Sequence, residues 1–70
     1  MFVKYSSNGS CVSIDVGMKY AGKFVSAGDN HLPVTTINRD GYAEIAFNIF
    51  RRFREELYVD EEKLVFEKSL

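Results

Sequence analysis

The sequence has few residues that could form a crosslink or bind a metal, and no segment suited to crossing a membrane. It contains one cysteine, Cys11, and one histidine, His31. A single cysteine excludes an internal disulfide, and one cysteine with one histidine is too few soft ligands for a zinc site. No apolar run approaches the roughly 18 residues of a membrane-spanning helix, and the N-terminus lacks the basic start and apolar stretch of a signal peptide. We therefore expect no cofactor, no metal and no membrane, and a soluble protein of the cytoplasm (the host's, if the chain is viral).

Neither sign of charge predominates. Nine Lys and Arg residues face ten Asp and Glu residues, for a formal net charge of -1. This balance gives no general attraction to nucleic acid or to anionic lipid. The hydrophobic fraction of 46% and the content of four Tyr and six Phe argue against disorder, and 70 residues make a single domain, 1–70. A domain this small has marginal stability, which leaves a homodimer open.

The sequence offers no catalytic motif. A nucleophile could be assembled from Cys11 and His31, but Cys11 falls on a predicted strand and His31 in a predicted surface loop, so both are interpreted as structural. Gly17, Gly22 and Gly28 do not have the spacing of a dinucleotide-binding or Walker loop. We therefore expect that the protein is not an enzyme.

Short apolar stretches between turn residues predict strands. Asn8-Gly9 is a strong hairpin signal, because both residues accept a positive φ at low cost. After this turn, Val12 and Ile14 alternate with polar neighbours, as in a strand with one buried face. The predicted strands cover residues 1–5, 11–16, 19–27, 32–37 and, after a polar connection, 63–67.

The segment from Tyr42 to Tyr58 predicts an amphipathic helix over about residues 40–58. At about 100° per residue, one side of this helix collects apolar residues: Tyr42, Ile45, Ala46, Ile49, Phe50, Phe53 and Leu57. On the other side, Arg51 with Glu55 and Arg52 with Glu56 have the i,i+4 spacing of ion pairs. The helix is therefore expected to cover the core with its apolar side.

A strand is the alternative for the first half of this segment. Residues 38–41 suit a tight turn that ends in Gly41, after which Ala43, Ile45, Phe47 and Ile49 would alternate on one face of a strand. Helix is favoured because residues 51–57 have high helix propensity and continue the apolar stripe. The elements together predict an α+β fold, a mostly antiparallel sheet of four to five short strands with one helix packed on one face, in the order ββββαβ.

Residues 13–22, SIDVGMKYAG, resemble the first strand of RuvC-like resolvases of the ribonuclease H superfamily. In that family an Asp on this strand, followed by Gly and a basic residue, begins a metal-binding nuclease site. The resemblance implies that role for Asp15. A two-metal site needs three or four converging carboxylates, and in the family the later ones come from a following strand and a C-terminal helix. The chain ends before those elements, so a degenerate nuclease fragment is the third interpretation of function.

One side of the predicted helix is the candidate protein-binding surface. It carries Phe47, Phe50, Arg51, Arg54 and Tyr58. Aromatic residues flanked by arginine are typical of the residues that dominate protein interfaces. The sequence therefore favours a small non-catalytic protein that recognises or inhibits another protein, such as an accessory protein of a phage or mobile element directed against a host defence or transcription complex. The alternative is a small dimeric regulator that binds DNA or RNA through Arg51, Arg52 and Arg54.

Overall fold

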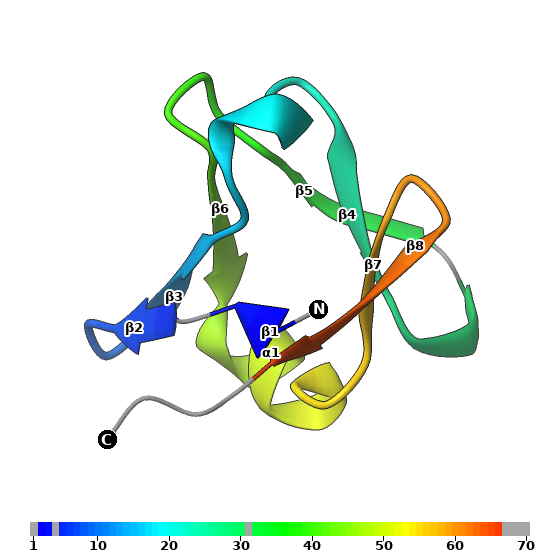
Figure 1. Cartoon of the computed structure of the whole chain (residues 1–70). Helices are drawn as coiled ribbons and strands as arrows, with labels where there is room; N and C mark the ends of the chain where they lie inside the picture. The colour runs from blue at the N-terminus through cyan, green and yellow to red at the C-terminus, as the bar shows by residue number, and fades with distance from the viewer. Residues whose placement is uncertain (1, 4, 31, 67–70) are drawn as a thin grey trace.

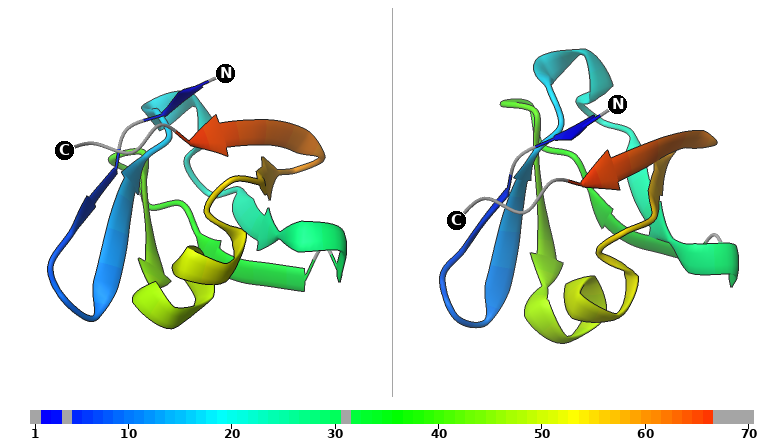
Figure 2. Two further views of the ribbon diagram at one scale, coloured as in Figure 1. Left: turned by 90° about the horizontal axis from the view of Figure 1, so that it is seen from below. Right: turned by 60° about the horizontal axis from the view of Figure 1, so that its bottom comes forward.

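The computed structural model describes residues 2–3, 5–30 and 32–66, and it has the predicted α+β class (Figure 1). Two small sheets lie on opposite sides of the core, and a short helix lies between them at one end (Figures 1 and 2). The elements in chain order are β1 (Phe2–Val3), β2 (Tyr5–Ser7), β3 (Cys11–Asp15), the 3-10 helix η1 (Met18–Tyr20), β4 (Phe24–Ala27), the 3-10 helix η2 (Gly28–Asn30), β5 (Leu32–Thr36), β6 (Tyr42–Ala46), α1 (Phe47–Phe53), β7 (Leu57–Val59) and β8 (Glu62–Phe66). No helix in the described part of the chain is long and apolar enough to cross a membrane.

The strands form two sheets where one was predicted. The first sheet has the order β1-β8-β7-β4-β5 and the second the order β2-β3-β6. Neighbouring strands are antiparallel, apart from the parallel pair of β1 with β8. The predicted strand 1–5 is divided between the sheets, since β1 pairs with β8 and β2 pairs with β3. Met1, Lys4 and Glu67 of the predicted strands lie outside the described residues.

Both sheets contribute to one hydrophobic core. In β3, Val12 and Ile14 are buried, and across the ladder they pair with Ile45 and Ala43 of β6, which are buried as well. This alternation is expected for strands that turn one face inward. Where the structure describes side chains, the buried apolar residues are Val12, Ile14, Val16, Tyr20, Val25, Ala27, Ile37, Ala43, Ile45, Phe50, Leu57, Val59 and Leu64.

The predicted helix 40–58 was wrong in its extent. Residues 42–46 form β6, paired with β3 along its whole length, and α1 is only seven residues long. The Asn38 side chain favours a strand at β6 because it fixes the turn before that strand. Its Oδ1 accepts the backbone N–H of Asp40 at 2.9 Å and of Tyr42 at 3.0 Å. From this turn, β6 runs antiparallel to β3. The alternative interpretation was therefore correct for residues 42–46.

The helix also ends earlier than predicted. It stops at Phe53, and residues 57–59, which were assigned to its last turn and to the polar connection, form β7. The predicted third strand, 19–27, begins only at Phe24 because residues 18–20 form η1. The remaining predicted strands were right within a residue or so, as β3, β5 and β8.

Candidate functional site

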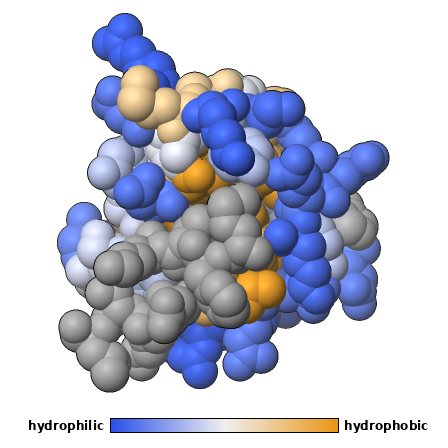
Figure 3. Space-filling view, viewed as in Figure 1, coloured by the Kyte–Doolittle hydropathy of each residue, from blue (hydrophilic) through white to orange (hydrophobic). Residues whose placement is uncertain are grey.

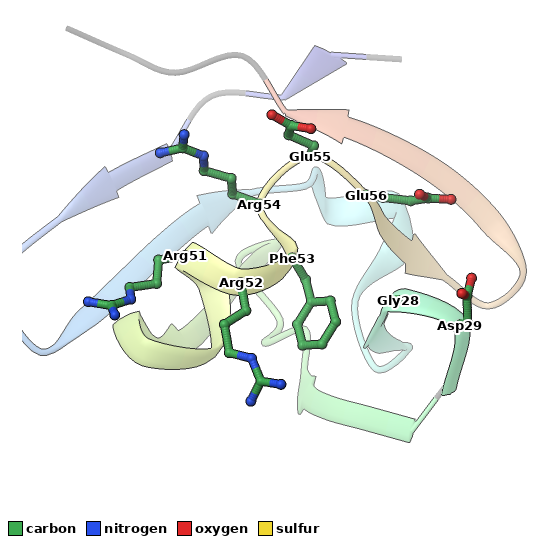
Figure 4. Close-up of a pocket in the computed structure, with 8 residues that line it drawn as sticks. All are labelled: Gly28, Asp29, Arg51, Arg52, Phe53, Arg54, Glu55 and Glu56. Atoms are coloured by element: carbon green, nitrogen blue, oxygen red, sulfur yellow. The ribbon is translucent and has the colours of Figure 1, made fainter.

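The early end of α1 changes the partners of its charged residues. The predicted pairs of Arg51 with Glu55 and of Arg52 with Glu56 are absent, because both glutamates follow the helix rather than lie on its surface. Glu56 instead pairs with Lys63, with 3.2 Å between its Oε1 and the lysine Nζ. In Figure 4 Glu56 points toward β7 and β8, away from Arg51 and Arg54.

The arginines of this region are exposed and have no acidic partner among the described residues. Arg51 and Arg52 lie on α1 and Arg54 lies directly after it. None of the three forms an ion pair within that part of the chain. Arg51 and Arg54 point to the side on which β2 lies, and Arg52 points away from it (Figure 4). The side of α1 nearer to β2 therefore carries two arginines that form no ion pair with an acid of the described residues, although Glu55 lines a smaller hollow with Arg54 and Tyr5.

A groove of about 270 Å³ runs between β2 and this side of the helix. We call it the β2–α1 groove, and its lining residues are Tyr5, Ser6, Ser7, Phe47, Phe50, Arg51 and Arg54. Phe50 forms its floor, since its side chain is 2% exposed and its ring centroid lies 4.6 Å from that of Tyr5. Phe47 remains 39% exposed. The groove thus combines an aromatic floor, an exposed aromatic residue and two cations.

The wall opposite the helix is a strand edge that no other described strand occupies. β2 is the outermost strand of its sheet and pairs only with β3 among the described strands. Such an edge carries backbone N–H and C=O groups that can pair with another chain. Ser6 and Ser7, both exposed, place only small polar side chains at this edge.

The structure brings together four of the five residues of the predicted surface. Phe47, Arg51 and Arg54 line the groove with exposed side chains. Phe50 lines it too, but as a buried part of the core, so its prediction as a contact residue needs correction. Tyr58 does not line the groove. It lies on β7, paired with Lys63 of β8, because the chain has left the helix before reaching it.

The Tyr58 hydroxyl is hydrogen-bonded to a carboxylate. It donates a hydrogen bond to Glu56 Oε1, the same oxygen that contacts Lys63. This hydrogen bond, together with partial burial and the negative charges of Glu56 and Asp29, raises the pKa of Tyr58 above its usual value of 10.0. Tyr58 therefore belongs to a polar cluster on the outside of the first sheet.

Three residues of the groove were not predicted. Tyr5, Ser6 and Ser7 lie on β2, about 40 residues before the helix in sequence, and they reach it through the pairing of β2 with β3 and the packing of Tyr5 on Phe50. The predicted hairpin at Asn8-Gly9 placed β2 beside β3. Nothing in the sequence pattern indicates which end of that hairpin the helix would contact.

A second hollow, of about 470 Å³, lies on the other side of α1 (Figure 4). Its lining residues are Gly28, Asp29, Arg51, Arg52, Phe53, Arg54, Glu55 and Glu56. The Phe53 ring packs so closely on Gly28 that a Cβ there would lie 2.7 Å from the ring, and the Arg52 guanidinium lies 5.4 Å from the same ring. Three acids accompany the three arginines, so this hollow has no single charge preference.

Cys11 and Asp15, the described residues considered for catalysis, lie at opposite ends of β3. Asp15 is exposed at the end of β3, and Cys11 is half-buried at its start with a free thiol. No three His, Cys, Asp or Glu residues of the described chain lie close enough to hold a metal ion. His31 lies outside the described residues.

Among the side chains that the structure describes, the large exposed apolar ones are spread over the molecule rather than gathered in one patch. They lie on five different elements: Met18, Phe24, Leu32, Tyr42 and Phe47. On the face seen in Figure 3, hydrophilic residues predominate and apolar residues reach the surface in small areas. Phe47 differs from the other four in lying beside a groove and two arginines without an ion pair in the described chain.

Comparison of the chain with protein-family models, with curated proteins and with solved structures finds no match.

Proposed function

We propose that the chain is a small non-catalytic binding protein that recognises another protein through the β2–α1 groove. The observation that carries the proposal is the exposed Phe47 beside Arg51 and Arg54, none of them engaged in an ion pair or ring contact within the described residues. Aromatic residues and arginine are the side chains most enriched among those that dominate protein interfaces.

The rigid setting of the groove supports this proposal. Its floor, Phe50, is buried and packs between Tyr5 and Phe66, whose ring centroids lie 4.6 Å and 6.0 Å away. A site built on packed elements loses little freedom on binding. With one free cysteine, the compartment that we propose is a reducing cytoplasm, and inhibition of a larger complex is the role that we favour for so small a protein.

Affinity capture with matched variants tests the proposal. The wild-type chain and the variant Phe47→Ala/Arg51→Ala are used as baits in a lysate of the cells in which the protein is made. The control is Tyr42→Ala/Arg39→Ala, which removes an aromatic residue of similar exposure, 42% against 39%, and an exposed arginine outside the groove. We expect the wild type and the control to recover the same partner and the groove variant to lose it. Equal recovery by all three baits would mean that the groove is not the contact.

A DNA- or RNA-binding regulator is the second candidate, and the absence of ion pairs at Arg51, Arg52 and Arg54 within the described chain favours it. Arg51 and Arg52 on α1 and Arg54 directly after it could contact phosphates of a single strand. A salt titration with a labelled single-stranded oligonucleotide separates the two candidates. Each phosphate contact should contribute about -0.7 to the slope of log K against log salt. A slope near zero or no binding would leave the protein partner as the proposal.

A further inference from the structure

We propose that the segment bound in the β2–α1 groove is an extended, acidic stretch of another protein, which adds as a further strand to the edge of β2 that no described strand occupies. The inference rests on the proposed function and specifies the conformation and charge of the bound segment. Addition of a strand to a sheet edge is a common mode of peptide recognition, in which the backbone supplies affinity and the alternating side chains supply specificity.

The backbone of β2 has groups directed to this edge. Asn8 N–H donates to the carbonyl of Cys11 at 3.1 Å, which sets the phase of the antiparallel ladder between β2 and β3. In such a ladder residues alternate between bonding to the partner strand and facing away from it. Ser6 therefore bonds to its partner Ser13, and Ser7 directs its N–H and C=O outward. Within the described residues, no backbone hydrogen bond joins Ser7 to any other element.

The side chains of an added strand would meet the helix. Directly paired residues of a sheet project to the same face, so Ser7 projects to the buried face with Val12 of β3. The helix lies against this face, as its groove residues lie opposite β2. Every second side chain of an added strand would therefore project to the side of the sheet on which α1 lies. Acidic side chains there would meet Arg51 and Arg54, and an apolar one would meet Phe47.

Charge distinguishes this occupant from a second copy of the chain. Two copies paired edge to edge through β2 would be related by a two-fold axis, which places both helices on the same face of the joined sheet. Each copy would then bring Arg51 and Arg54 toward those of the other without a compensating acid from the described residues. An extended acidic segment supplies backbone partners for the edge of β2 and carboxylates for the arginines.

Peptide binding to the full chain tests the inference. The probes are fluorescein-labelled peptides of about seven residues, the length of a short strand, in which every second position is threonine and the positions between them carry glutamate and one phenylalanine. The controls replace glutamate by lysine. We expect at least one acidic peptide to bind measurably by fluorescence anisotropy and its lysine counterpart not to bind. If no acidic peptide binds more tightly than its lysine counterpart, the inference is wrong.

Methylation of the peptide backbone tests strand addition itself. In an added strand only alternate N–H groups face β2, so N-methylation of one alternate set should abolish binding and methylation of the other set should leave it largely intact. Amide hydrogen exchange at Ser7 should slow in the complex. Equal loss with both methylated sets, or unchanged exchange at Ser7, would contradict a strand at this edge.

Charge reversal identifies the arginines involved. Arg54→Glu should weaken binding of the acidic peptide roughly tenfold or more, the scale of one charge-assisted hydrogen bond. The matched control is Arg39→Glu, an exposed arginine in the loop between β5 and β6, at the far end from α1 (Figure 1). Equal effects of the two variants would indicate non-specific attraction and overturn the inference. Capture of a partner that depends on Phe47, with no peptide binding, would leave the proposed function intact and reject only strand addition.

Discussion

At the scale of single residues, Gly41 holds the end of the β5–β6 loop against the segment that follows β3. Its carbonyl accepts the N–H groups of Val16 at 2.9 Å and Gly17 at 3.0 Å, and its φ is +85°. A Cβ at this position would lie 2.5 Å from the backbone of Gly17 and of Met18. Backbone atoms cannot move aside as a flexible side chain can.

Gly41→Ala should therefore destabilise the fold far more than the same change at Gly22. Gly22 has the same φ of +85°, and a Cβ added there would have no atom within 4 Å. Gly22→Ala should cost only the strain of the left-handed conformation, about 1–2 kcal/mol, whereas Gly41→Ala should cost roughly 3 kcal/mol or more. Urea unfolding measures both. Equal losses would mean that the close backbone contact at Gly41 does not exist.

The raised pKa of Tyr58 predicts a pH dependence at the alkaline end. The folded chain holds the phenol proton more tightly than the unfolded chain, because the hydroxyl donates to Glu56. This contribution to stability is fully present below the unfolded pKa of about 10 and is lost as the pH rises through the folded pKa. In an ultraviolet titration, with Tyr58→Phe used to identify the signal, Tyr58 should ionise at a higher pH in the wild type than in Glu56→Gln. An unchanged titration in Glu56→Gln would show that this carboxylate is not the cause.

At the scale of elements, α1 is stabilised by its packing on the core more than by its own helix propensity. It has seven residues, fewer than an isolated helix needs to be stable in water. Its N-terminus has no side-chain cap, and Phe50 is its one buried residue. The helix is therefore held by the packing of Phe50 on Tyr5 and Phe66, together with Ile49 and Phe53, which are partly buried against the core.

Truncation of Phe50 and of Phe47 should affect stability and binding differently. Phe50→Ala should destabilise the protein by about 3–5 kcal/mol, as deletion of a buried aromatic side chain does. Phe47→Ala should cost less, about 1 kcal/mol, because the residue is 39% exposed and is not one of the buried core residues, and it should reduce binding in the groove. Denaturant unfolding and the peptide assay measure the two effects. A strongly destabilised Phe47→Ala would place that residue in the core and remove it from the site.

The segment 42–58 explains how far the sequence could predict this fold. Its apolar residues fit both a helical period and, from 43 to 49, a strand alternation, so the pattern left two interpretations open. Two sets of contacts determine that residues 42–46 form a strand: β6 pairs with β3, which is distant in sequence, and Asn38 fixes the turn before β6. The α+β class and the strands with clear alternation, such as β3, were predictable because local pattern and burial agree there.

The candidate site was predictable in part for the same reason. Phe47, Arg51 and Arg54 are close in sequence, and a helical turn brings them together wherever the helix begins. The predicted pairs of Arg51 with Glu55 and of Arg52 with Glu56 were wrong, since they assumed that the helix continued beyond Phe53. The β2 wall of the groove could not be predicted, because it depends on the way in which one sheet is placed against the helix.

At the scale of the whole molecule, the two sheets share one core and should unfold together. Ile14 of β3 belongs to the same buried cluster as Ile37, which follows β5 and bonds to the segment before β4. Neither sheet has a second apolar cluster of its own among the described buried residues. A chain of this length has a total stability of about 3–10 kcal/mol. That is too little for each sheet to be stable as a separately folding unit.

Matched variants in the two halves should therefore shift every probe alike. Ile14→Val and Ile37→Val, each expected to cost about 0.5–1.5 kcal/mol, should lower the urea midpoint equally when unfolding is followed by far-ultraviolet circular dichroism and by tyrosine fluorescence. The peptide-binding signal should disappear at the same urea midpoint, because the β2–α1 groove depends on both sheets. One wall of the groove is β2 of the three-stranded sheet, and its floor, Phe50, packs on Phe66 of the five-stranded sheet. Separate transitions, or binding that survives the loss of one sheet, would mean that the groove is built by one half of the molecule alone.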